Sequence, residues 1–148
     1  MRGQRGVTVV ELVIVLIILA IVFGLAWPLA GALLADTAIK GAAEQVASAI
    51  RLTRQHAITQ AVPHAIQFED GGRSYRIVRD LPGEAETVEG PVTLAHGAVA
   101  TGRPRLRFSP LGAAIPAGTV TVEVGEQRLA VVVNFPGRVR IGAPPRGR

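Results

Sequence analysis

The chain has 148 residues, of which 49% are hydrophobic and 18% are charged, against a charged share of about a quarter in ordinary soluble domains. This length suffices for one compact domain with an appendage and is too short for two domains. The sequence contains no cysteine, which excludes a disulfide scaffold, thiolate zinc sites and thiol catalysis. The net charge is +5, and arginines gather toward the C-terminus, a clustering that permits a polyanion-binding face without establishing one.

An apolar stretch runs from Val7 to Trp27, and its only polar side chains are one threonine and one glutamate. As a helix it would be about 31 Å long, close to the thickness of the hydrocarbon core of a bilayer. Two arginines precede it, and positive charge flanking a span marks the cytoplasmic side. We therefore expect residues 7–28 to form a single transmembrane helix, with residues 1–6 in the cytoplasm and the rest of the chain outside it.

A secretory signal peptide is the alternative interpretation of this segment. It also has a basic start, and Ala30-Gly31-Ala32 fits a small-x-small cleavage site. Such a chain would be soluble and would begin near Asp36 or a little earlier. Two features count against it: the apolar stretch is longer than the usual run of about 7–15 residues, and it carries Glu11. A carboxylate within a span costs roughly 2.5–3.5 kcal/mol and usually has a partner, unless it lies near enough to the membrane surface to stay hydrated.

The sequence Gly6-Val7-Thr8-Val9-Val10-Glu11-Leu12, followed by the aliphatic run, resembles the type III signal of type IV prepilins and of the pseudopilins of type II secretion. In that family a prepilin peptidase cuts after the glycine, here Gly6, and methylates the new N-terminal residue, here Val7. The family prefers Phe or Met where this chain has Val7. The resemblance implies that Glu11, the fifth residue after the cut, is an assembly residue that pairs with the free amine of a neighbouring subunit.

Beyond Pro28 a helical pattern resumes, and we expect residues 29–62 to continue the helix as an amphipathic segment that ends before Pro63. Its apolar face is narrow and is expected to pack into the core of a small domain. The positions of that face recur at steps of four and three: Ile39, Ala43, Val46, Ile50, Thr53 and Ala57.

Short segments of alternating polarity follow, and they predict an extracytoplasmic β domain over residues 63–141. Glycine-containing turns at 70–72 and 125–127 indicate two hairpins. Residues 79–104 are the least regular, and we expect loops there around one short strand. A basic tail, residues 142–148, is expected to be mobile. The expected strands are 65–69, 74–78, 91–94, 105–108, 119–124, 128–133 and 139–141.

The second half of the chain is similar to the GspH/FimT branch of the pseudopilins. The resemblance implies an α+β, type IV pilin-like fold, in which a long N-terminal helix, transmembrane in its first half, packs on one or two small antiparallel sheets. The helical segment 47–58 also resembles that branch. The other matching segments are Phe108-Ser109-Pro110-x-Gly112, Gly118-Thr119-Val120-Thr121-Val122, Val131-Val132-Val133 and Gly137-Arg138-Val139-Arg140.

Arginines near the C-terminus are the candidate binding residues. Arg138 and Arg140 alternate on a predicted strand and so share a face, and Arg146 and Arg148 lie beyond them. A Gly-Arg-x-Arg element at this place is associated with DNA binding on the FimT side of the branch, while the GspH side also tends to carry Gly-Arg-Val. In the alternative interpretation, Gly137 makes a turn and the arginines only solvate the strand.

Enzymatic motifs are not found in the sequence: it has no nucleophile elbow, no His-Glu-x-x-His and no phosphate loop. His56 and His64 are eight residues apart across a proline, a poor spacing for a shared metal ion. We therefore expect no catalytic residue, no metal site and no cofactor.

A minor pseudopilin of type II secretion is the function that these features favour. Such a protein is a structural component of the pseudopilus, incorporated at or near its tip after cleavage by prepilin peptidase, and its partners are other pseudopilins. It would be anchored in the bacterial inner membrane by a single span, with its C-terminal domain in the periplasm or outside the cell. The alternatives are a FimT-like, pilus-associated DNA-binding pilin and a secreted soluble domain.

Overall fold

The computed structural model describes the backbone of residues 8–144, and the side chains of residues 8–24, 34–83 and 85–144. Two compact units follow each other along the chain, one up to Leu34 and one from Ala35 onward. A single helix, α1 (Val9–Thr59), contributes to both units. It ends four residues before Pro63, whose ring removes the amide hydrogen that a continuing helix needs.

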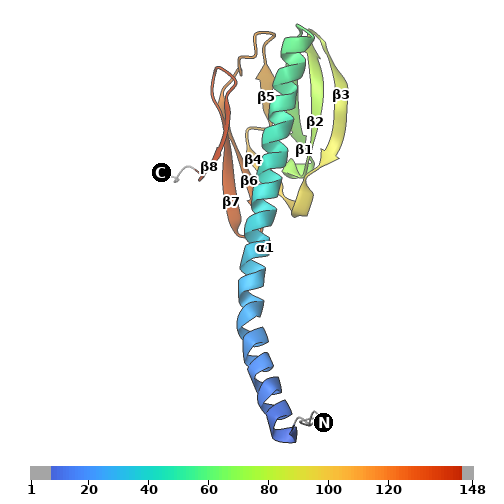
Figure 1. Ribbon diagram of the computed structural model, residues 1–148. Coiled ribbons are helices and arrows are strands. Elements are labelled where there is room, and N and C mark those ends of the chain that lie inside the picture. The colour runs from blue at the N-terminus through green and yellow to red at the C-terminus, as the bar shows by residue number, and fades with distance from the viewer. Residues whose placement is uncertain (1–7, 145–148) are drawn as a thin grey trace, which may run out of the picture. The chain divides into compact units, whose positions relative to one another are not determined.

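The second unit holds two antiparallel sheets of four strands, ordered β3-β2-β1-β5 and β4-β6-β7-β8. Within this unit α1 lies across both sheets, and β3 and β8 are at opposite outer edges (Figure 1). The strands are β1 (His64–Glu69), β2 (Ser74–Leu81), β3 (Glu84–Thr93), β4 (Val99–Gly102), β5 (Arg105–Phe108), β6 (Gly118–Val124), β7 (Gln127–Val133) and β8 (Val139–Gly142). Two short 3-10 turns, η1 (Asp70–Gly72) and η2 (Ala95–Gly97), connect them.

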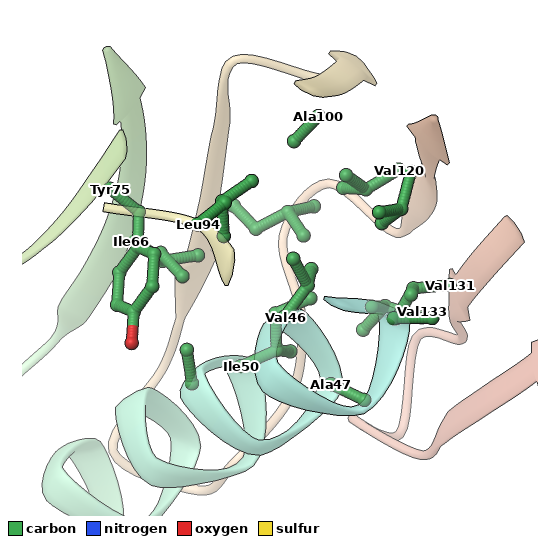
Figure 2. Packing of buried hydrophobic residues seen from close by; sticks show 14 of the residues in the cluster. Val46, Ala47, Ile50, Ile66, Tyr75, Leu94, Ala100, Val120, Val131 and Val133 are labelled. Carbon is green, nitrogen blue, oxygen red and sulfur yellow. The ribbon is translucent and has the colours of Figure 1, made fainter. Parts of the chain in front are cut away.

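The core of the second unit lies between α1 and the inner faces of both sheets (Figure 2). Every residue of the apolar stripe predicted over 39–57 is buried, so that prediction is confirmed. Several buried helix positions are alanines, which allow the sheets to approach the helix backbone closely. The sheets contribute most of the larger side chains, which include Ile66, Ile77, Leu106, Phe108, Val120, Val122, Val131 and Val133.

Two polar side chains of α1 bind the backbone of the β domain. The Gln45 amide donates to the Thr93 carbonyl (3.1 Å) and its oxygen accepts from the Ala95 N–H (2.8 Å), where β3 passes into η2. Further along the helix, Arg54 Nε donates to the Gly112 carbonyl (3.0 Å) in the loop after β5. The bonds to Ala95 and Gly112 satisfy backbone groups outside the sheet ladders, and all three bonds hold the helix against the β domain.

Both predicted hairpins are present: β1 pairs with β2 and β6 with β7 in antiparallel register. The loop expected across most of residues 79–104 is wrong, because β2 extends to Leu81 and β3 and β4 both lie in this region. β3 is an exposed edge strand with a register shift against β2. Its sequence therefore lacks the regular alternation of apolar and polar residues from which a half-buried strand is predicted. β8 includes Gly142, and residues 145–148 lie outside the described part of the chain.

Tyr75 is the only tyrosine and is 7% exposed in the core (Figure 2). Burial, followed by the negative charge of Glu89, raises the pKa of Tyr75 above its usual 10.0. The phenol ionises at a lower pH in the unfolded chain than in the folded protein. The neutral, buried phenol therefore contributes fully to the free energy of unfolding below pH 10, and this contribution is lost as the pH rises through the folded-state pKa. We expect tyrosinate absorbance of the native protein to titrate above pH 10, and at a lower pH in Glu89→Gln. A native midpoint at pH 10 would contradict this placement.

Candidate functional site

The N-terminal turn of α1 is capped by Thr8. Its Oγ1 accepts a hydrogen bond from the Glu11 N–H (3.2 Å), and its carbonyl accepts from the Leu12 N–H (3.1 Å). This geometry makes Thr8 the N-cap and Glu11 the third helical residue, the Thr-x-x-Glu spacing of a capping box. The sequence interpretation counted Thr8 only as part of the N-terminal signal, although the Thr-x-x-Glu spacing was available to predict its capping role.

Glu11 is exposed and lies in the first turn of α1, where the helix dipole favours a negative charge. Among the described residues, its carboxylate forms no ion pair and accepts no hydrogen bond. The group is thus available to a cation from another molecule. Gly6 and Val7, the predicted cleavage and methylation positions, lie outside the described residues.

The helix surface around and after Glu11 is apolar on every side and exposed to solvent. The exposed fraction of the large side chains from Val9 to Phe23 runs from 45% at Leu19 to 79% at Val9. A contiguous apolar surface of this extent marks a site of contact with membrane or protein. No helix in the described part of the chain meets the length and hydropathy required of a membrane span.

The turn between β7 and β8 is built on Gly137, which is buried and has φ of +80°. A Cβ at this position would lie 2.2 Å from the Gly112 carbonyl oxygen and 2.5 Å from Arg54 Nε. Gly137, Gly112 and Arg54 therefore form one close-packed cluster that joins the two loops to α1. The glycines come from two of the segments that carry the family resemblance, and Arg54 from a third. The sequence interpretation missed the role of Arg54 because it lies off the apolar stripe.

Arg138 and Arg140 are both exposed, and neither forms an ion pair with the described residues. Arg140 lies within β8, opposite Val132 of β7, while Arg138 immediately precedes the strand. Val139 and Ile141, between and after them, pack against the core. Gly137 thus makes the turn, as one interpretation expected, and the two arginines are free at the surface. Arg146 and Arg148 lie outside the described residues.

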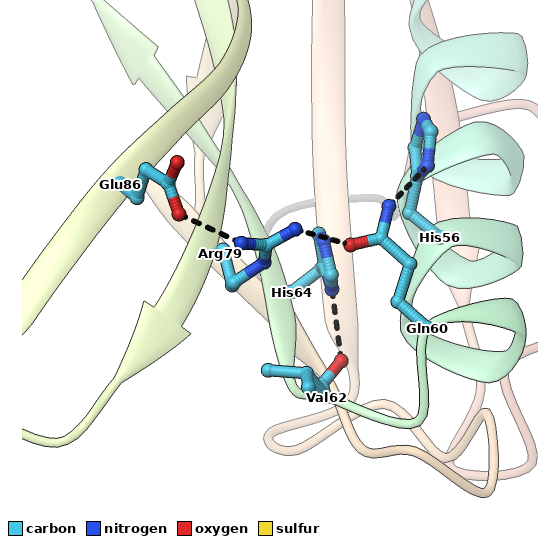
Figure 3. Close-up of polar contacts among 6 residues, drawn as sticks. All are labelled: His56, Gln60, Val62, His64, Arg79 and Glu86. Atoms are coloured by element: carbon cyan, nitrogen blue, oxygen red, sulfur yellow. Dashed lines mark hydrogen bonds and ion pairs between the residues drawn. The ribbon is translucent and has the colours of Figure 1, made fainter.

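The rings of His56 and His64 stack at a centroid distance of 5.8 Å (Figure 3). Gln60 donates to Nδ1 of His56 (3.3 Å) and accepts from Arg79 (2.7 Å), which in turn binds Glu86 (2.8 Å). His64 is fully buried, and its Nδ1 bonds to the Val62 carbonyl (2.8 Å). No group of three ligating side chains suited to a metal ion occurs among the described residues. The network joins the end of α1 to the first sheet.

A family profile described as "Type II transport protein GspH" matches residues 42–137 of the chain. The chain belongs to the GspH family. A second profile, described as "Prokaryotic N-terminal methylation motif", matches residues 1–27, the part that contains Gly6, Val7 and Glu11. The predicted family is thereby confirmed at both ends of the sequence. No curated protein sequence matches the chain.

Solved structures of pilin-like proteins share the fold of this GspH-family chain. The type IV minor pilin FimU of Pseudomonas aeruginosa superposes with a TM-score of 0.62 at 17% identity, covering 72% of this chain and 90% of FimU. The minor pseudopilin EpsH of the Vibrio cholerae type 2 secretion system gives a TM-score of 0.58 at 15% identity, covering 74% of this chain and 99% of EpsH. The predicted α+β, pilin-like fold is confirmed, with α1 packed on antiparallel sheets.

Proposed function

We propose that this GspH-family chain is a minor pseudopilin of a type II secretion system, incorporated at or near the tip of the pseudopilus. Prepilin peptidase cuts it after Gly6 and methylates Val7. The apolar part of α1 anchors it in the inner membrane as a single span, with the β domain in the periplasm or outside the cell. Its partners are other pseudopilins, and its role is structural.

The observation that carries this proposal is the chemistry of the first turns of α1. A helix that exposes apolar side chains on all sides, within a chain carrying the N-terminal methylation motif, requires lipid or other helices around it. The one carboxylate on this surface, Glu11, has no partner within the described residues. Such a group is costly to bury alone and is stabilised when an opposite charge pairs with it.

The amine created by cleavage supplies that charge. Cleavage after Gly6 leaves a positive N-terminus on Val7, at the same end of the helix as Glu11. When apolar helices of neighbouring subunits bundle, the amine of one and the Glu11 carboxylate of the next neutralise each other in a region of low dielectric constant. This pairing sets the axial offset between subunits, while the apolar surfaces supply most of the contact area.

Intact mass and N-terminal sequencing test the proposal on protein extracted from membranes after co-expression with a prepilin peptidase. We expect a mature chain that begins at methylated Val7 and remains in the membrane fraction. The matched control is Gly6→Leu, expected to stay uncut while still entering the membrane. A soluble chain that begins between about residue 33 and Asp36 would overturn the proposal in favour of a secreted domain.

A second candidate function is that of a pilus-associated, DNA-binding pilin, and exposed arginines without ion pairs favour it. Arg138 and Arg140 are free at one edge of the β domain, with Arg146 and Arg148 following in the sequence. Side chains of this kind contact phosphates without reading bases, so binding would depend strongly on salt.

Binding of duplex DNA at low salt tests this second function. If it holds, Arg138→Ala/Arg140→Ala should weaken binding by about tenfold or more. The slope of log affinity against log salt concentration should also become shallower, by the amount expected for the loss of about two phosphate contacts. Arg128→Ala is the matched control, because Arg128 is also exposed but is paired with Glu123. Absence of binding at low salt, or equal loss in the control, would end this candidate.

A further inference from the structure

The two outer strands of the β domain leave backbone groups unpaired. β3 ends the first sheet and β8 ends the second, and each pairs with only one neighbour. They lie at opposite edges of the domain (Figure 1). A free strand edge is a template for pairing with another chain, and proteins limit unwanted pairing with charges, β-bulges, prolines and short edge strands.

The β8 edge is positive. Residues 138–142 hold two arginines and no acid. Arg138 and Arg140 are both exposed, and neither has an ion-pair partner among the described side chains. In the adjoining hairpin, Glu123 of β6 is already bound to Arg128 (3.3 Å). The positive charge of this edge is therefore available to a partner.

The β3 edge is negative. Residues 84–93 hold three glutamates and no basic residue. Glu86 is bound on one side by Arg79 of β2 (2.8 Å), yet its side chain remains 60% exposed. Glu89 is exposed and forms no ion pair within the described residues. Val88 is also exposed, at 36%, so this edge offers negative charge around a small apolar centre.

We propose that the β8 edge of one copy of this chain docks against the β3 edge of a second copy. The two edges are complementary in charge: Arg138 and Arg140 face the Glu86 and Glu89 side chains across the contact. The register shift against β2 and Pro91 break the regularity of the β3 edge, so the flanking charges carry the contact and supply its specificity. This inference goes beyond the proposed function, because it concerns contact between copies and holds for a secretion or an uptake system alike.

Charge also determines which edges meet. Two β8 edges repel each other, and so do two β3 edges, because each carries one sign of charge. A symmetric dimer through either edge is thereby disfavoured, and only the head-to-tail contact brings opposite charges together. The contact is therefore heterologous, with a different surface of each copy meeting the other.

Cysteine crosslinking tests the contact on the full chain in detergent or vesicles, because the natural sequence contains no cysteine. One population carries Thr87→Cys on the exposed face of β3, and the other carries Gly142→Cys at the end of β8, where an added Cβ meets nothing within 4 Å. With a short bifunctional thiol reagent, we expect dimers in the mixture and few in either population alone. Dimers in a single population, or none in the mixture, would overturn the proposal.

Charge reversal provides the matched control. Arg140→Glu on the β8 population, or Glu89→Arg on the β3 population, should each lower the crosslinking yield by about tenfold or more, since facing like charges cost several-fold in affinity each. The two reversed populations mixed together should regain it. A yield unchanged by reversal overturns the proposal. So does duplex DNA that binds at Arg140 while the yield stays at background, which assigns the arginines to nucleic acid.

Discussion

Replacing Gly137 by alanine is expected to lower the free energy of unfolding by about 3 kcal/mol or more. Two effects add at this position. Holding a residue with a side chain at positive φ costs about 1–3 kcal/mol, and φ is +80° here. The added Cβ also lies 2.2 Å from the Gly112 carbonyl oxygen, a backbone atom that moves only if the loop after β5 moves, and such overpacking costs about 1–3 kcal/mol.

Denaturant unfolding followed by circular dichroism measures this loss, and two other glycines separate its causes. Gly125 also has positive φ, of 57°, but an added Cβ there meets nothing within 4 Å, so Gly125→Ala should cost only about 1 kcal/mol of backbone strain. Gly142→Ala has neither effect and should change stability by less than about 0.5 kcal/mol. If Gly137→Ala costs no more than Gly125→Ala, the close packing against Gly112 and Arg54 is wrong.

Replacing Glu11 by alanine is expected to reduce incorporation into pseudopili by about a hundredfold or more. Removing one partner of a buried ion pair costs about 3–5 kcal/mol, because the remaining charge stays buried without compensation. Here the remaining charge is the proposed amine on Val7 of the neighbouring subunit. The measurement is the ratio of fibre-associated to membrane-associated protein in cells that assemble pseudopili.

Three controls make the Glu11 result specific. Cleavage after Gly6 should be unchanged in Glu11→Ala, which separates assembly from processing. Thr8→Ala removes the helix cap while keeping the Glu11 carboxylate. It should lower the stability of the helix by only about 1 kcal/mol, and incorporation should fall much less than in Glu11→Ala. Glu126→Ala removes an exposed acid in the turn between β6 and β7 and should have no effect. Normal incorporation of the Glu11→Ala variant into pseudopili would contradict the proposal that Glu11 is an assembly residue.

The helix and both hairpins could be predicted from the sequence because their signals are local. The stripe from Ile39 to Ala57 has helical spacing, and its residues are buried because one helix face packs against the sheets. The turns at Gly71-Gly72 and Gly125 supply the positive φ values that tight connections need. Each of these elements depends on residues close together in the chain.

Features that depend on how separate elements meet could not be predicted from the sequence. β3 is a strand because β2 offers it a hydrogen-bonding edge, while its own side chains are mostly exposed and acidic. The spacing of His56 and His64 predicted no joint role, yet antiparallel return of the chain stacks their rings. Similarly, nothing near Arg54 in the sequence indicates that Gly112 and Gly137 close around it. The first and third features depend on how distant segments pack, and the second on the path of the chain between α1 and β1.

The hydrogen bonds that Gln45 and Arg54 make from α1 also have a mechanical consequence. The two side chains lie nine positions apart on the helix. They form hydrogen bonds to the β domain at separate points, Thr93–Ala95 and Gly112. A pull along the helix axis would load both points in shear at the same time, together with the packed alanine face between them. Within the second unit, the sheets would then move together with residues 35–59 of α1, and tension would not separate the sheets strand by strand.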